Sequence, residues 1–153
     1  MLDQPDVDVW ITADSFAEAG SGICWYENVG ISYGWGSWQV LVDTDELLVY
    51  DGMEEFDLHD LARKLEEHRC IAMMAPMIDM YSDQPLSAVK YDAGERMMEC
   101  CSFFDSDYLW QAKQDGSKKL VGGPRLRLLS RDGELFHQSL MKHPFYRMDR
   151  RLV

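Results

Sequence analysis

The stretch "WQVLVDTDELLVYDG", Trp38–Gly52, decides the fold expected for this chain because it joins a largely apolar run to a cluster of acids. Residues 38–42 have the composition of a central strand that is covered on both faces of a sheet. Asp43, Asp45 and Glu46 follow directly, so the strand is predicted to end at Asp43. The stretch therefore predicts carboxylates at the end of a buried strand.

A second strand with the same ending follows one helix later. "FDLHDLARKLEEHR", residues 56–69, has Asp57 as a predicted helix N-cap, apolar residues on one side and charges on the other. "CIAMMAPMIDMY", residues 70–81, is predicted to be a second buried strand, which leads into Asp79 and Asp83. In open α/β sheets ligands bind at the carboxyl ends of strands, so the two acidic strand ends are expected to share one site.

The remaining elements are predicted from weaker sequence patterns. Alternating apolar residues predict a strand at 7–11, and residues 21–34 predict a helix with Ser21 as N-cap. "GGPRLRLLS", residues 122–130, is predicted to be a strand that places Arg125 and Arg127 on one face. The order of elements predicts an α/β fold over residues 1–153: one domain with a mixed, mainly parallel sheet flanked by helices.

Composition narrows the classes of protein to consider. With 153 residues, 46% of them hydrophobic, the chain is expected to be globular. It contains no apolar stretch near the roughly 18 residues that span a bilayer, and its start is acidic where a signal peptide is basic. We therefore expect no transmembrane segment and a cytoplasmic location. The net charge of −12 argues against a nucleic-acid binder.

Charge is distributed unevenly along the chain. Residues 112–153 contain ten Lys or Arg residues and four acidic residues, whereas residues 1–111 contain five Lys or Arg residues and 23 acidic residues. A basic segment together with metal-holding acids could grip an anionic ligand, although a solvated face is the commoner use of such charge.

The Asp43-x-Asp45 pattern has three interpretations. Calcium binding in an EF-hand loop is rejected, because Leu47 and Leu48 stand where an oxygen ligand and a glycine belong. A phosphatase of the haloacid dehalogenase type would use Asp43 as nucleophile and Asp45 as acid/base, but Leu47 replaces the expected Thr or Val. In a sugar-nucleotide transferase, the two acids would hold Mg²⁺ or Mn²⁺ against the departing diphosphate.

The third interpretation gains from a resemblance. "DTDELLVY", "DMYSD" and "GGPR", in this order and at these separations, resemble bacterial family 2 glycosyltransferases that carry a GT-A domain, over nearly the whole chain. The resemblance implies a nucleotide-sugar donor, a hydroxyl acceptor such as a saccharide, and Mn²⁺ or Mg²⁺ on Asp45, with Asp43 near the nucleotide. It implies acceptor contact or the catalytic base for Asp79 or Asp83, and contact with phosphate or acceptor for Arg125.

Two parts of the family's pattern have no counterpart here. The first nucleotide-binding strands would precede "DVDVWITADSF", and the histidine that completes the metal site would follow "KHPFYRM". The resemblance therefore predicts a partial GT-A domain with an exposed sheet edge, which a second copy or a partner chain would cover. The alternative is a non-catalytic remnant, a ligand-binding module that keeps the acidic loop.

Overall fold

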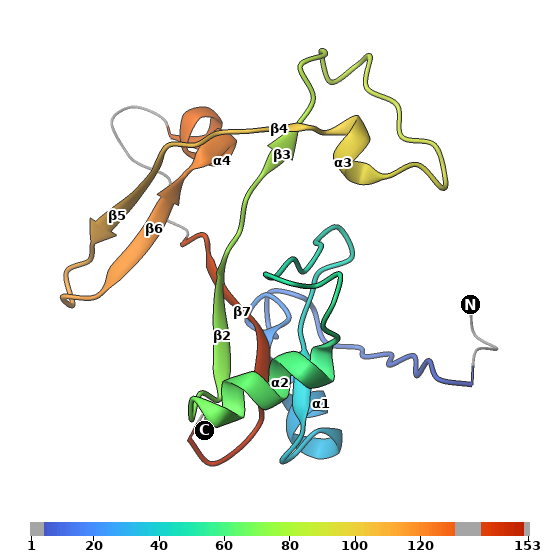
Figure 1. Cartoon of the computed structure of the whole chain (residues 1–153), viewed down its shortest axis with the longest axis vertical. Coiled ribbons are helices and arrows are strands. Elements are labelled where there is room, and N and C mark those ends of the chain that lie inside the picture. The colour runs from blue at the N-terminus through green and yellow to red at the C-terminus, as the bar shows by residue number, and fades with distance from the viewer. Residues whose placement is uncertain (1–4, 131–138, 152–153) are drawn as a thin grey trace. The chain divides into compact units, whose positions relative to one another are not determined.

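The computed structural model describes residues 5–130 and 139–151, which contain four helices and seven strands (Figure 1). The chain divides into two compact units. The first unit comprises Met1–Val40, Phe56–Ile71 and Tyr146–Val153, and the second comprises Leu41–Glu55 and Ala72–Phe145. We describe each unit by itself.

In the first unit, helix α1 (Ile23–Tyr33) begins after Gly22 and ends at Gly34. Gly22 has a φ of 82°, a left-handed conformation that favours glycine, and the Phe16 ring lies against it. The helix predicted for residues 21–34 is confirmed, but Gly22 is its N-cap instead of Ser21. Strand β1 (Trp38–Val40) follows, and the Gln39 side chain donates to the main-chain oxygens of Gly30 and Gly34 at 3.2 and 2.9 Å.

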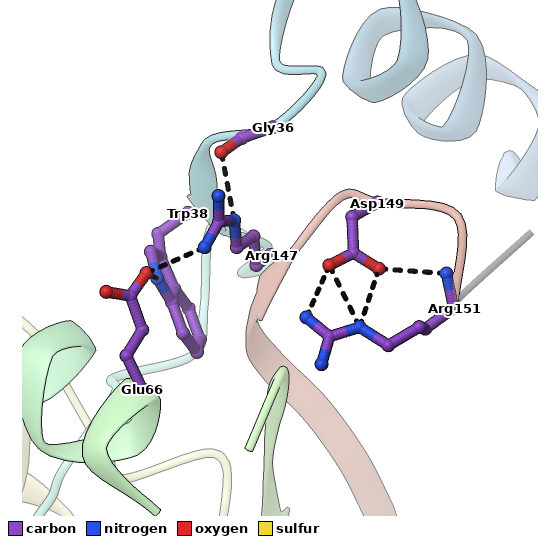
Figure 2. A network of polar contacts seen from close by, with 6 residues as sticks. All are labelled: Gly36, Trp38, Glu66, Arg147, Asp149 and Arg151. Carbon is purple, nitrogen blue, oxygen red and sulfur yellow. Dashed lines mark hydrogen bonds and ion pairs between the residues drawn. The ribbon is translucent and has the colours of Figure 1, made fainter. Parts of the chain in front are cut away.

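Helix α2 (Leu58–Glu67) is the most clearly encoded element of the first unit. Its predicted N-cap is confirmed: the Asp57 carboxylate accepts from the Asp60 N–H at 2.9 Å, and the Asp60 side chain accepts from the Asp57 N–H. Near its other end, Glu66 accepts from the Trp38 indole at 2.8 Å and from Arg147 at 3.0 Å (Figure 2). These contacts tie both ends of α2 to defined partners.

A three-stranded sheet has the order β1-β7-β2, with β2 at Ala72–Pro76 and β7 at Met141–Arg147. The Met148 N–H donates to Ser37 and the Leu41 N–H to Pro144, so β7 runs antiparallel to β1. The hydrogen bonds that join residue 147 to 71 and residue 77 to 140 show that β7 is also antiparallel to β2. Strand β7 therefore lies between the two strands that α2 connects.

The second unit contains two smaller antiparallel sheets. Strands β3 (Met80–Tyr81) and β4 (Phe103–Phe104) form one, and the short helix α3 (Met97–Cys100) precedes β4. Strands β5 (Tyr108–Ala112) and β6 (Lys118–Gly122) form a hairpin that leads directly into helix α4 (Gly123–Leu129) (Figure 1). The buried hydrophobic residues of this unit that the structure describes are Leu120, Val121, Leu140 and Phe145.

The predicted fold class, an α/β GT-A-like domain with a mainly parallel sheet flanked by helices, is wrong. The described strands form antiparallel sheets of two and three strands. The strand–helix–strand order suggested that β1 and β2 are parallel neighbours. They are not neighbours, because β7, which comes from much later in the chain, pairs with both. β1 is consequently an edge of its sheet and not a central strand.

Two predicted strands are also wrong. Within the predicted strand 122–130, residues 123–129 form α4, because Pro124 occupies the first turn, where its missing N–H costs nothing, and because Leu and Arg favour a helix. Residues 7–11 form neither helix nor strand: Ile11 is 94% exposed, and the Trp10 ring contacts Tyr33 instead. Among the helices of the described residues, none has the length and apolarity to cross a membrane.

Candidate functional site

The acids after β1 lie in a tight turn. The Glu46 N–H donates to the Asp43 main-chain oxygen at 3.1 Å, so residues 43–46 turn back on themselves. Asp43 and Asp45 therefore lie on a turn and not on extended backbone.

Lys142 of β7 neutralises two of these acids. Its Nζ donates to Asp43 at 2.8 Å and also to Glu46. The hydrogen bond and charge of Lys142 lower the pKa of Asp43 below its ordinary value. Burial lowers the pKa of Lys142, but the hydrogen bonds and charges of Asp43 and Glu46 outweigh it and raise the pKa above its usual value. Lys142 is a residue of this site that the sequence pattern missed.

Asp45 is exposed at the tip of the turn and makes no ion pair with the residues that the structure describes. Nor do those residues contain any group of three His, Cys, Asp or Glu side chains placed to hold a metal ion. The two acidic pairs, Asp43 with Asp45 and Asp79 with Asp83, therefore do not converge into one cluster.

Asp79 and Arg125, predicted separately, lie together. Nη2 of Arg125 lies 2.9 Å from Oδ1 of Asp79. The Arg125 side chain is 37% exposed and the Asp79 side chain is 17% exposed. Asp79 lies between β2 and β3, whereas Arg125 lies in the first turn of α4. Because α4 follows directly after the hairpin of β5 and β6, the hairpin positions Arg125 next to Asp79. Two residues that are distant in sequence are therefore in contact.

Tyr108 of β5 completes this group. A Cβ on Gly123 would lie 3.3 Å from the Tyr108 hydroxyl and 3.8 Å from Asp79 Oδ2, so both groups flank the glycine. Both polar atoms are buried and have no hydrogen-bond partner among the described residues. Burial, and then the charge of Asp79, raise the pKa of Tyr108. We call Asp79, Tyr108, Gly123 and Arg125 the Asp79 cluster.

A second polar group involves the neighbouring arginine of α4. Asp105 accepts from the Tyr81 hydroxyl at 2.6 Å and from Arg127 at 2.8 and 3.1 Å. The Tyr81 hydrogen bond, followed by that of Arg127, lowers the pKa of Asp105, and the same bond to Asp105 raises the pKa of Tyr81. Arg125 and Arg127 thus hold different carboxylates, since residues two apart on a helix point in different directions.

Asp83 is exposed in the loop after β3, and the Gln84 side chain donates to it at 3.0 Å. Within the described part of the chain, no hydrogen bond joins Asp83 to Asp79. The structure therefore supports one composite site, the Asp79 cluster, and leaves Asp45 and Asp83 as exposed carboxylates.

Comparison of the chain with protein-family models, with curated proteins and with solved structures found no match.

Proposed function

We propose that this chain acts in glycosyl transfer from a nucleotide-sugar donor to a hydroxyl acceptor, with the acceptor at the Asp79 cluster. The observation that carries the proposal is the ion pair between Asp79 and Arg125. These residues belong to the "DMYSD" and "GGPR" motifs, which carry the resemblance to family 2 glycosyltransferases. Two motifs that contribute to one site are expected to meet in space, and these two do.

The Asp79 carboxylate has the groups that a catalytic base needs. Arg125 holds Oδ1, while Oδ2 is buried without a partner among the described residues. A buried acceptor atom left unpaired costs free energy, so an acceptor hydroxyl that donates to Oδ2 recovers that cost. Because Oδ2 is covered, the side chains around it have to move to admit the acceptor.

The proposed transfer is a single displacement. Asp79 Oδ2 accepts the proton of the acceptor hydroxyl as the hydroxyl oxygen attacks the anomeric carbon. The bond between that carbon and the diphosphate breaks, and the diphosphate leaves with the electron pair. Asp83, the exposed carboxylate nearby in sequence, is the alternative base, and substitution distinguishes the two.

We assign the divalent cation, Mn²⁺ or Mg²⁺, to Asp45. Magnesium is commonly bound through one or two carboxylates plus the phosphates of the substrate, so a three-residue protein cluster is not required. Asp45 is exposed and free to take such a role, whereas Asp43 is engaged by Lys142. The cation supplies charge neutralisation for the departing diphosphate.

A phosphatase with Asp43 as nucleophile is a second candidate, because one observation favours it. Lys142 Nζ lies 2.8 Å from Asp43, where a cation would offset the charge of an approaching phosphate. If neither reaction occurs, the chain is a ligand-binding module without turnover.

The discriminating experiment is to incubate the protein with a panel of nucleotide sugars and Mn²⁺ and to measure nucleoside diphosphate release. Release that falls at least tenfold in Asp79→Asn and in Asp45→Ala, but not in Asp51→Asn, supports the transferase; Asp51 is an exposed acid of the same unit. Loss in Asp83→Asn alone moves the base to Asp83. Release that none of these substitutions changes contradicts the proposal. Hydrolysis of an aryl phosphate, abolished in Asp43→Asn, favours the phosphatase.

A further inference from the structure

The first unit contains a pocket that has no part in the proposed glycosyl transfer. Its volume is about 250 Å³, and it lies where α2 ends and β7 leaves the sheet. Its lining consists of three arginines, one acid and one cysteine: Glu66, Arg69, Cys70, Arg147 and Arg151. The lining carries a formal charge of +2 on a chain whose net charge is −12.

Two of the arginines are held in place by their partners. Arg147 donates through Nε to the Gly36 main-chain oxygen at 3.1 Å and through Nη1 to Glu66 at 3.0 Å (Figure 2). Arg151 donates through Nε and Nη2 to Asp149, at distances of 2.6 to 3.2 Å. Figure 2 shows Asp149 along one edge of the Arg151 guanidinium group, whereas Gly36 and Glu66 contact Arg147 from different directions. Fixing the groups in advance lowers the entropy lost when a ligand binds.

Hydrogen-bond donors remain for a ligand. Within the described residues, Arg147 Nη2 and Arg151 Nη1 make no hydrogen bond, and neither does the side chain of Arg69. A guanidinium group presents five N–H donors in a planar fork that matches the oxygens of a phosphate. Three such groups around one pocket exceed what the two acids Glu66 and Asp149 can satisfy.

One effect opposes an anion here, because the pocket lies near the negative end of the α2 dipole. That end corresponds to roughly half an elementary charge. The last carbonyls of α2 already accept hydrogen bonds from the N–H groups of His68, Arg69 and Cys70. With Asp149, the partner of Arg151, included beside Glu66, the three arginines still leave a formal charge of +1, which exceeds the half charge of the dipole.

We propose that this pocket binds a small phosphorylated compound, through Arg69, Arg147 and Arg151, without a metal ion. A phosphate or diphosphate group offers oxygens on several sides, which suits donors that come from both the segment after α2 and the C-terminal part of the unit. The pocket residues all belong to the first unit, whereas Asp45 and the Asp79 cluster belong to the second. The inference is therefore independent of the proposed glycosyl transfer.

Cys70 provides a direct test because it is an exposed thiol in the pocket. The probe is inorganic pyrophosphate in EDTA, at an ionic strength matched with NaCl, and the readout is the rate of iodoacetamide alkylation by peptide mass spectrometry. Cys24, another exposed thiol of the same unit, is the internal control. We expect pyrophosphate to slow alkylation of Cys70 at least threefold and to leave Cys24 unchanged. Equal slowing of both thiols, or no slowing, overturns the proposal.

Substitutions distinguish a specific contribution of the pocket arginines from a general effect of positive charge. Arg69→Ala removes a guanidinium group that has no side-chain partner among the described residues. It should weaken pyrophosphate protection about tenfold, in line with one lost charge-assisted hydrogen bond. Arg63→Ala is the matched control, since Arg63 is an α2 arginine outside the pocket whose side chain is 67% exposed. Equal protection in wild type and Arg69→Ala, or equal weakening by both substitutions, contradicts the assignment.

Discussion

The ion pair between Asp79 and Arg125 should be measurable as a coupling energy in a double-mutant cycle. At the N···O distance of 2.9 Å, two unit charges attract by about 6 kcal/mol at an effective dielectric of 20. Desolvation and partial exposure offset much of this attraction, because the two side chains are 17% and 37% exposed. We expect a net coupling of about 1–2 kcal/mol between Asp79→Asn and Arg125→Met.

The assay is urea denaturation of protein labelled with 5-fluorotryptophan, followed by ¹⁹F NMR. Trp110 is the only tryptophan of the second unit, so its signal reports unfolding where the pair lies. The matched control is the cycle of Asp43→Asn with Lys142→Met, in which the Asp43 side chain is 68% exposed and the coupling should stay below about 1 kcal/mol. If the Asp79 and Arg125 substitutions add to within about 0.5 kcal/mol, the two side chains are independent and our reasoning about the cluster is refuted.

Three further predictions concern stability. Asp57→Ala should cost about 1 kcal/mol and speed hydrogen exchange in α2, because the helix loses its capping box; unchanged exchange would contradict this. A Cβ on Gly122 would lie 2.6 Å from a main-chain oxygen, so Gly122→Ala should lower the free energy of unfolding by more than about 2 kcal/mol. The control is Gly116→Ala, because Gly116 has a φ of 80° and open space around it, so that this substitution should cost about 1 kcal/mol. Equal costs for Gly122→Ala and Gly116→Ala would argue against the clash at Gly122. The lowered pKa of Asp43 means that its pairing with Lys142 stabilises the fold above the unfolded-state pKa and is lost as pH falls through the folded-state pKa. Acid titration of stability should therefore show a loss of under about 1 kcal/mol that Asp43→Asn lacks.

Local features of the chain could be predicted from sequence where several signals agreed. Helix α2 has an acidic N-cap, an apolar side and good helix formers, and its predicted start at Asp57 is confirmed. Helix α1 was also predicted, although its cap shifted from Ser21 to Gly22 because Ser21 itself takes a φ of 61°. Agreement among independent local signals is what made these two helices predictable.

Non-local pairing could not be predicted. Nothing in the residues of β7 shows that this strand inserts between β1 and β2, and that insertion changes the sheet from parallel to antiparallel. The alternation of Arg and Leu in residues 125–128 fits a strand and a short helix equally, and Pro124 decides for the helix.

The candidate site shows the same division between local and non-local information. Asp79 and Arg125 were each singled out from sequence, but their contact depends on how the hairpin delivers α4. Tyr108 and Lys142 carried no recognisable motif, since a tyrosine in a strand and a lysine in a basic segment have many commoner uses. Their roles emerge only from burial and from distance.

Calorimetric titration of a nucleoside diphosphate, with Mn²⁺ and with EDTA, tests the proposed transferase most directly. We expect Mn²⁺-dependent binding that is lost in Asp45→Ala and retained in Arg69→Ala. Any binding that persists in EDTA should instead weaken about tenfold in Arg69→Ala, because it belongs to the arginine pocket. Binding that is equal in Mn²⁺ and EDTA, or unchanged in Asp45→Ala, would contradict a metal and diphosphate role for the turn after β1.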